Sequence, residues 1–559
     1  MVREAYWHKV LRAQISRRRV IGTAAGLVGV SLVGCAAAPA ATPTPARAPA
    51  PGATATPAPR ITPTPTVKVL DQLVLAFPRD VPTLDGNVQP THVEGANLND
   101  LIYDPLTTRD RDLKLAPGLA TSWKSSSDGK VWEVKLRTGV KFHNGEEFDA
   151  EAVKFSIERI QKPELKSNQF IFWKDVGVEV LAKDTVRIIY KEPSPLLPNR
   201  LGVVNAVPRR YILENGDKVM NEKPMGTGPY KFVKWAKDDS IEMEWAGVSH
   251  WRVANPPAKK IIFKVIPTES ARIAALKTGA ADIIWNIAPD LTKEVTADPN
   301  LGITVQPASS VLYISISLFK EGPLRDKRVR QALGYALDLK TIVKELFGDL
   351  YQVMKVVSNP LCFGYDAAIE SYPYDPKKAK QLLAEAGYPN GFEVVFTTPA
   401  VAYPKYKEYT QALANYWAEI GVKATIKPDT DSASVWARGL RMENRGPEGI
   451  YHTGQSCGSF FDLDEVLGAY FINWNQKDAT GNHLYIEDGE LDKIIMATKT
   501  TVDPEARRKL FNQALRRINE EAYAIPLWAL TYNTGYNKKK IKTFRPHGFL
   551  LSPWDIEVA

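Results

Sequence analysis

One short motif in this chain has the residue types of a catalytic nucleophile. Residues 454–458 (GQSCG) fit the G-x-S-x-G pattern, in which a serine on a tight turn between a strand and a helix attacks a carbonyl carbon. His483 and His547 follow in the sequence and could serve as the base. The apolar run before the motif is only three residues long, and residues 459–462 after it show no helical pattern. We therefore expect no catalytic residues. A serine hydrolase that uses Ser456 is kept as the alternative prediction.

The histidines do not show the spacing of a metal-binding set. Metal sites built from His or Cys usually pair two ligands a few residues apart on one element. The seven histidines are instead scattered along the chain: His8, His92, His143, His250, His452, His483 and His547. The sequence predicts neither a metal site nor a cofactor, and leaves open a metal carried inside an organic chelator.

A third chemically distinctive residue is Cys35, which follows an export-like segment. Residues 1–34 carry six Lys/Arg and one acid, and end in the charge-free run VIGTAAGLVGVSLVG. This 15-residue run is shorter than the roughly 20 residues that span a bilayer, so residues 1–34 are predicted to be a signal peptide. Residues 32–35 (LVGC) resemble a bacterial lipobox, which predicts lipidation of Cys35, and residues 16–21 resemble a twin-arginine export signal. General export is the alternative to the twin-arginine route. A short uncleaved anchor helix is the alternative to cleavage and lipidation.

Residues 35–66 are predicted to be a lipid-anchored linker. Ala, Pro and Thr make up 27 of the 31 residues that follow Cys35. Such a composition has too little apolar bulk to form a core, and its prolines favour the extended polyproline II conformation. The segment would hold a globular body near a membrane.

Length, charge and cysteine content limit what the body can be. About 490 residues follow the linker, which indicates two or three domains. The net charge is +9, but without residues 1–34 it falls to 66 Lys/Arg against 62 Asp/Glu, and we expect no nucleic-acid partner. Cys362 and Cys457 could pair outside the cytoplasm, although two cysteines so far apart in sequence are more often separate buried thiols.

The body alternates strand and helix patterns, which predicts an α/β fold. Helices are expected after the capping residues Asp149, Asp375 and Asp503, with glycine stops at Gly387 and Gly421. Strands are expected at residues 73–77 (LVLAF), 131–136 (VWEVKL), 185–190 (TVRIIY), 261–266 (IIFKVI) and 392–396 (FEVVF).

Two further segments have a predicted structural role. A hairpin should turn at residues 127–129 (SDG). Residues 326–330 (DKRVR) are expected to be a solvated first turn of a helix.

Several strings of residues, in order along the body, resemble one protein family. They are residues 115–123 (LAPGLATSW), 142–159 (FHNGEEFDAEAVKFSIER), 226–230 (GTGPY), 323–338 (PLRDKRVRQALGYALD), 379–393 (AKQLLAEAGYPNGFE) and 503–527 (DPEARRKLFNQALRRINEEAYAIPL). Together they resemble the peptide/nickel-type (family 5) extracytoplasmic solute-binding proteins of ABC importers.

The resemblance implies a periplasmic-binding-protein-like clamshell with two α/β lobes and an additional inserted domain, three domains in all. Domain I would be discontinuous, from residues 67–110, 222–306 and 527–559. Domain II would be the inserted residues 111–221, and domain III residues 307–526. Crossing segments near Pro307 and Pro526 would form a hinge that closes over a solute.

The resemblance also implies what the protein does and with what partners. It would be a membrane-anchored lipoprotein on the extracytoplasmic face that captures a small solute, such as an oligopeptide or oligosaccharide, and delivers it to ABC permease and ATPase subunits. We expect a monomer. The alternative partner is a membrane kinase for which the lobes act as a sensor.

The predicted solute site lies around residues 454–459. Peptide-binding members of the family commonly carry here an Asp that pairs with the α-amino group of the ligand, but this stretch is neutral and the nearest acids are Asp462 and Asp464. Short free peptides are therefore disfavoured as ligands. The predicted ligand-binding residues are Thr91, His92, Trp436, Tyr451, His452, Gln455, Ser456, Trp474 and Tyr532.

Overall fold

The computed structural model describes residues 68–559, except for residues 89–92, 248–249, 319–320, 349, 400–402, 430–448, 458–459, 474–483 and 547–549. The chain divides into two units, residues 1–65 and residues 66–559, and the described residues all belong to the second, which is compact. The predicted signal peptide, Cys35 and the linker up to residue 66 lie outside the described residues. The hydrophobic cores described below all belong to the second unit.

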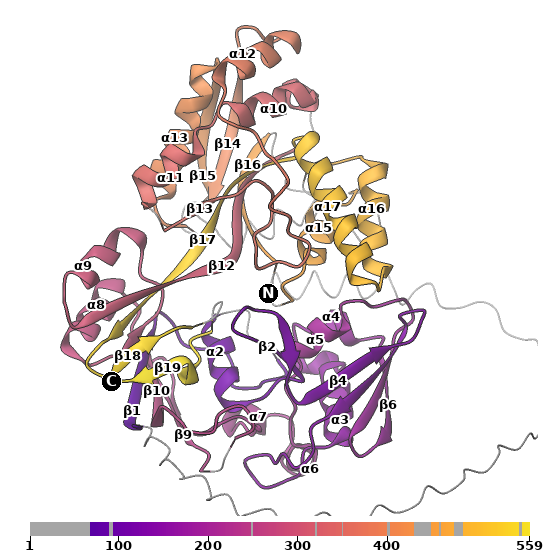
Figure 1. The fold of residues 1–559 in the computed structure, drawn as a ribbon, viewed down its shortest axis with the longest axis vertical. Helices are drawn as coiled ribbons and strands as arrows, with labels where there is room; N and C mark the ends of the chain where they lie inside the picture. Colours follow the sequence, from indigo (N-terminus) through magenta and orange to yellow (C-terminus); the bar gives the residue numbers. More distant parts are fainter. Residues whose placement is uncertain are drawn as a thin grey trace, which may run out of the picture. The chain divides into compact units, whose positions relative to one another are not determined.

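A mixed sheet runs through the second unit, with the strand order β15-β14-β16-β12-β17-β11-β1-β10-β9-β8 and β13 paired to β17 (Figure 1). Its strands are β1 (Leu70–Phe77), β8 (Tyr230–Ala236), β9 (Ser240–Trp245), β10 (Ala258–Val265), β11 (Ile283–Ile284), β12 (Leu301–Ile316), β13 (Gln352–Val353), β14 (Phe392–Pro399), β15 (Val422–Asp429), β16 (Ile450–Ser456) and β17 (Ala524–Asn537). The long strands β12 and β17 pair antiparallel from Leu301↔Asn537 to Ser315↔Ala524, with register shifts after Pro307 and after Leu312. They join the strands on either side into one sheet.

The two faces of strand β12 lie against different helices, because successive side chains of a strand point to opposite faces. Leu312 and Ile314 belong to a core with the first group of helices, α10 to α13, whereas Tyr313 packs in a core with the second group, α15 to α17. The first group is α10 (Lys327–Tyr335), α11 (Leu339–Phe347), α12 (Pro376–Glu385) and α13 (Tyr406–Glu419), and the second is α15 (Asp464–Tyr470), α16 (Gly489–Thr500) and α17 (Pro504–Glu520). Figure 1 shows α11 and α13 on one side of β14 and β16 and α15, α16 and α17 on the other.

A smaller antiparallel sheet with its own core lies between α2 and β8 in the sequence. Its order is β4-β5-β7-β6, and it packs with α3 around buried residues such as Trp132, Val153 and Ile188. The elements of this part are β2 (Thr107–Arg109), β3 (Leu115–Pro117), β4 (Ala120–Ser125), β5 (Val131–Leu136), α3 (Ala150–Ile160), α4 (Phe170–Trp173), β6 (Gly177–Ala182), β7 (Thr185–Ile189), α5 (Leu197–Arg200), α6 (Arg209–Asn215) and α7 (Val219–Glu222).

The remaining elements pack near β1 and the C-terminal end of β17. Helix α2 contributes Leu98 and Leu101 to a core with β1 and β10. These elements are α2 (Val93–Ile102), α8 (Glu269–Thr278), α9 (Thr292–Thr296), β18 (Ile541–Phe544) and β19 (Ile556–Val558).

The local sequence signals predicted these elements well. The five predicted strands fall within β1, β5, β7, β10 and β14, apart from one residue beyond the end of β7 and one beyond β10. Asp149, Asp375 and Asp503 each accept a hydrogen bond from a backbone N–H in the first turn of the helix that follows. Gly387 and Gly421, which follow α12 and α13, both have a φ of 91°, a conformation that stops a helix and favours glycine. The α/β prediction is confirmed.

The structure corrects one expectation and decides one open question. Arg330 is not solvated but 3% exposed, because its guanidinium donates to the backbone carbonyls of Leu324, Arg325 and Glu521. The open question was whether Cys362 and Cys457 pair, and the structure shows that they form a disulfide across 95 residues of sequence. Their Cα atoms lie 5.8 Å apart, within the range of protein disulfides.

Candidate functional site

The predicted solute site centres on the end of β16. Gln455 and Ser456 are its last two residues, opposite Val311 and Ser310 of β12. Because neighbouring strand residues face opposite sides, the positions of Gln455 and Tyr451 share one face of β16. Ser456 and His452 share the other.

His452 lies on the face of β16 that packs against α13. Its ring is 2% exposed and lies 5.3 Å from the ring of Tyr403 and 5.2 Å from that of Tyr409. Burial lowers the pKa of His452 to about 3, because a charged imidazolium is disfavoured away from water. The imidazole is thus a neutral part of the core. Because the ring is almost fully buried, the structure does not support the predicted contact between His452 and a solute.

Tyr532 is the predicted site residue on β17. It pairs with Gln306 of β12, and its ring lies 4.7 Å from that of Trp285. Burial raises the pKa of Tyr532 to about 12, so its hydroxyl is a neutral hydrogen-bonding group at physiological pH. Thr91, His92, Trp436 and Trp474 lie outside the described residues and stay predictions.

The segment that follows β16 is held in place by a covalent bond and by the backbone. The disulfide joins Cys457 to Cys362. The backbone N–H of Phe363 donates to the carbonyl of Phe461 at 2.7 Å, and the N–H of Leu463 donates to the carbonyl of Phe363 at 3.3 Å. Phe461 has a left-handed φ of 52°, a backbone conformation that costs a non-glycine residue free energy and that these bonds stabilise.

Neither of the acids next to the site is free to bind an amine. Asp462 is 1% exposed and receives two hydrogen bonds from Arg507 of α17, at 2.5 and 2.8 Å. Asp464 lies 3.9 Å from the ammonium of Lys499. The first two carboxylates after Gln455 in the sequence are therefore neutralised by cations of the protein itself.

Sequence reasoning missed the contacts that the β16 loop makes with the first part of the chain. Arg109, at the end of β2, donates to the carbonyl of Phe460 at 2.7 Å, and Phe172 of α4 meets Phe460 edge to face at 5.3 Å between ring centroids. Arg109 and Phe460 are 351 residues apart. Neither residue belongs to a recognisable motif, so no local signal could have paired them.

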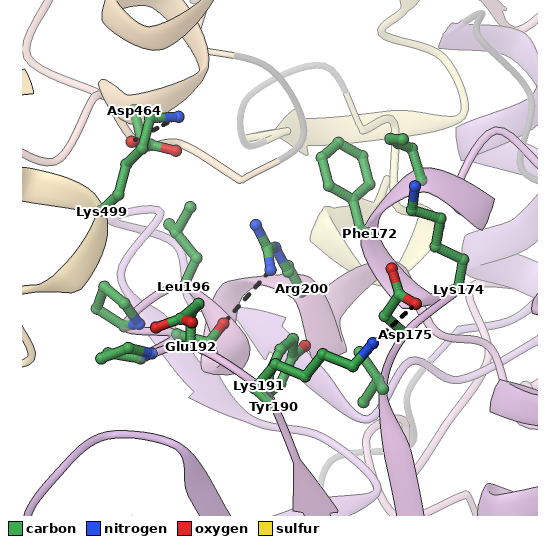
Figure 2. A pocket seen from close by; sticks show the side chains of 15 residues that line it. Phe172, Lys174, Asp175, Tyr190, Lys191, Glu192, Leu196, Arg200, Asp464 and Lys499 are labelled. Carbon is green, nitrogen blue, oxygen red and sulfur yellow. Dashed lines mark hydrogen bonds and ion pairs between the residues drawn. The ribbon is translucent and has the colours of Figure 1, made fainter. Parts of the chain in front are cut away.

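A pocket of about 340 Å³ lies beside these contacts. Residues of α4 and the segment directly after it, and of the loop between β7 and α5, line most of it, and Asp464 and Lys499 come from α15 and α16. Figure 2 shows Lys191 and Asp175 directed toward one another on one wall, while the guanidinium of Arg200 lies 5.2 Å from the ring of Phe172. Its lining combines aromatic faces with paired charges, which suits a small polar molecule better than a lipid tail.

Next to Asp464, Glu465 is an unusual carboxyl group. Burial, together with the charges of Asp462 and Asp464, raises the pKa of Glu465 to about 8, whereas Arg200 acts in the opposite direction. Its Oε2 accepts no hydrogen bond from the residues that the structure describes. Glu465 is therefore predominantly protonated at neutral pH.

The geometry does not fit the hydrolase alternative. Ser456 ends a strand, but the next helix begins only at Asp464, and Cys457 between them is tied into the disulfide. A nucleophile elbow needs the helix directly after the serine. His483 and His547, the proposed bases, lie outside the described residues.

Among the residues that the structure describes, no group of three or more His, Cys, Asp or Glu side chains is placed to hold a metal ion. In the described part of the chain, none of the helices combines the length and the apolar character needed to cross a bilayer.

Comparison with known proteins gives consistent matches. The model of the bacterial extracellular solute-binding proteins, family 5 (middle), matches residues 114–478. The glutathione-binding protein GsiB of Salmonella typhimurium is 29% identical over 429 residues, which cover 76% of this chain and 82% of that protein.

Solved structures share the fold over nearly their whole length. NikZ from Campylobacter jejuni, in complex with Ni(L-His), is 26% identical with a TM-score of 0.70, covering 87% of this chain and 99% of NikZ. The ABC transporter substrate-binding protein CtaP from Listeria monocytogenes has a TM-score of 0.78 at 22% identity, covering 88% of this chain and 100% of CtaP. The fold is thus that of the periplasmic binding proteins, and the matches do not support a serine hydrolase.

Proposed function

Because the chain belongs to family 5 of the bacterial extracellular solute-binding proteins, we propose that it binds an organic solute at the end of β16 and that no free carboxylate of the protein takes part in this binding. Proteins of this family are substrate-binding receptors of ABC importers. They bind small solutes outside the cytoplasm and work with permease and ATPase subunits. The chain is thus a receptor of that kind, and its solute and its attachment to the cell are the points on which we go further.

The proposal about the solute rests on the ion pairs of Asp462 and Asp464, the first two acids after Gln455 in the sequence. An α-amino group buried in a protein needs a carboxylate partner, since an unpaired buried charge is costly. Arg507 already neutralises Asp462, and Lys499 lies beside Asp464. A solute whose binding depends on a free N-terminus would have to draw a carboxylate away from one of these cations. An oligosaccharide, or a peptide-like molecule bound through other groups, meets no such cost.

The relatives suggest which solutes to test first. The names of the relatives give glutathione as the ligand of GsiB and nickel with L-histidine as that of NikZ. Both are small organic or organically chelated solutes. We propose that this chain takes a solute of comparable size, works as a monomer and breaks no bond in it.

The N-terminus supports a membrane attachment. We propose that residues 1–34 are removed as a twin-arginine-like signal peptide and that Cys35 receives a lipid, so that residues 35–66 tether the receptor to the extracytoplasmic face of the cell membrane. The tether would keep the receptor at a high local concentration near its permease.

Identification of the copurifying solute tests the proposal directly. The compact unit Thr66–Ala559 would be purified under native conditions, denatured, and its small molecules identified by mass spectrometry. We expect one organic solute in near-stoichiometric amount, and its addition back to the refolded protein should raise Tm. A bound peptide whose affinity is lost on N-acetylation would contradict the proposal.

A further inference from the structure

Arg109 connects two parts of the chain that are remote in sequence. One of its terminal nitrogens donates to the carbonyl of Leu113 in its own β2–β3 hairpin at 3.2 Å, and the other donates to the carbonyl of Phe460 at 2.7 Å. Its guanidinium also lies 5.0 Å from the ring centroid of Phe461, a distance typical of cation–π contacts. Arg109 thus bridges the hairpin to the loop after β16.

Phe172 strengthens the same contact from a second element. Its ring meets that of Phe460 at 5.3 Å with an interplanar angle of 83°, a favourable edge-to-face geometry. Arg200 lies over Phe172 at 5.2 Å. Phe460 itself is only 2% exposed, so the residues around it exclude water from the Arg109 hydrogen bond.

The inserted residues reach the α15–α17 group at a second point. A Cβ atom at Gly129, in the β4–β5 turn, would lie 2.2 Å from a methyl group of Val502, which precedes α17. These contacts join different elements of the same two parts of the chain, and residues of both parts line the pocket of Figure 2, so together they define an extended interface.

We propose that Arg109, Phe172, Phe460 and Phe461 form a latch that fastens residues 107–200 to the loop after β16 and thereby sets how firmly the receptor stays closed on its solute. None of the four residues needs to touch the solute. They act as positioning residues, because the loop they hold continues directly from Gln455 and Ser456. The inference rests on the proposed solute site at the end of β16.

The loop after β16 is anchored in a way that couples its position to that of the end of β16. On its own side it is anchored by the disulfide of Cys457 and by the buried Asp462–Arg507 pair. Because Cys457 is bonded to Cys362 and the carbonyl of Phe461 accepts from the N–H of Phe363, the residues that Arg109 holds and the end of β16 are attached to the same two-residue segment.

The test measures the separation of the two parts without any solute. In the compact unit Thr66–Ala559, Lys183→Cys in the β6–β7 turn and Lys493→Cys on α16 provide label sites whose side chains are 72% and 81% exposed. The native cysteines are bonded to one another and buried. Double electron–electron resonance between spin labels then reports the distance distribution.

Arg109→Met keeps the length of the side chain but removes its donors, and Phe172→Leu removes the ring contact with less risk to folding. Loss of a hydrogen bond from a charged donor should raise the ratio of long-distance to short-distance molecules by about 10- to 100-fold for Arg109→Met. Phe172→Leu should raise the same ratio by about 2- to 10-fold.

Arg111→Met is the matched control, because Arg111 lies in the same hairpin with its side chain 72% exposed. It should leave the distribution unchanged. If both latch variants give the distribution of the parent protein while circular dichroism shows them folded, the latch does not exist. The distances are read without solute, so a failure to find a copurifying solute would count against the proposed function and not against the latch.

Discussion

Arg507 and Asp462 form a buried ion pair in which two guanidinium nitrogens lie 2.5 and 2.8 Å from the two carboxylate oxygens. The Nε of Arg507 donates to the carbonyl of Thr498 at 2.8 Å, and its guanidinium lies 4.7 Å from the ring centroid of Phe511. The pair joins α17 to the loop after β16. It both neutralises the first acid after the proposed solute site and fixes the loop.

Replacement of Arg507 by Met should therefore destabilise the protein strongly. The substitution leaves the carboxylate of Asp462 buried without its cationic partner, which costs about 3–5 kcal/mol in the free energy of unfolding. Urea denaturation followed by circular dichroism measures the loss. Arg516→Met on the same helix is the control, since Arg516 is 49% exposed and pairs with Asp366 at 3.3 Å. It should cost at most about 1 kcal/mol, and equal losses in the two variants would contradict the role of the buried pair.

The disulfide should contribute to stability independently of that pair. Cys362→Ser combined with Cys457→Ser removes a cross-link between residues 95 apart, and we expect a loss of about 2–4 kcal/mol because the unfolded chain regains freedom. The compact unit Thr66–Ala559 contains only these two cysteines. Thiol titration of the denatured parent should find no free thiol before reduction and two after it. Free thiols in the unreduced protein would show that the bond is absent.

Local and long-range features of this fold differ in how far the sequence reveals them. The helix caps at Asp149, Asp375 and Asp503 were predictable, because each side chain bonds a backbone N–H within three residues. The disulfide and the Arg109–Phe460 contact join residues 95 and 351 positions apart, and only the tertiary fold brings them together.

The misjudged residues follow the same division. Arg330 was misjudged because a charged residue within a charged run is typical of solvated surface. One of the three carbonyls that accept its hydrogen bonds belongs to Glu521, 191 residues away in the sequence. For the site, its location at the end of β16 stays a prediction, and no pattern in the sequence indicated that His452 points into the core between two tyrosines.

Glu465 should make stability depend on pH. Its pKa is raised to about 8 in the folded protein from an ordinary value of 4.5, so between these values the folded state binds more protons than the unfolded state. Stability should therefore fall as pH rises from 4.5 to 8, by at most about 1.4 kcal/mol per pH unit. Chemical denaturation at a series of pH values measures the slope.

Glu465→Gln should remove this contribution and make the protein more stable than the parent at pH 8. Glu505→Gln provides the control, because the side chain of Glu505 is 74% exposed on α17. If the parent and Glu465→Gln lose stability in parallel between pH 5 and 8, the carboxyl group is ionised in the folded protein at neutral pH.

Cys35 should determine where the protein is found in the cell. If a lipid on its thiol anchors the receptor, Cys35→Ala should move the full-length chain from the membrane fraction to the soluble extracytoplasmic fraction and abolish incorporation of a labelled fatty acid. Ser31→Ala, four residues earlier, should change neither result. Full membrane retention of the Cys35→Ala protein would instead indicate that residues 20–34 stay in the membrane as an anchor.

Gln455 offers a way to change the choice of solute. An Asp at this position would place a carboxylate at the end of β16 that neither Arg507 nor Lys499 already neutralises, so it could pair with the α-amino group of a peptide. We expect Gln455→Asp to bind free tripeptides at least about tenfold more tightly than their N-acetylated forms, measured by isothermal titration calorimetry. Ser456→Asp introduces the same charge on the opposite face of the strand and should show no such preference. A preference for free N-termini in the unmodified protein, or its equal appearance in both variants, would mean that the neutral end of β16 does not control which solute is bound.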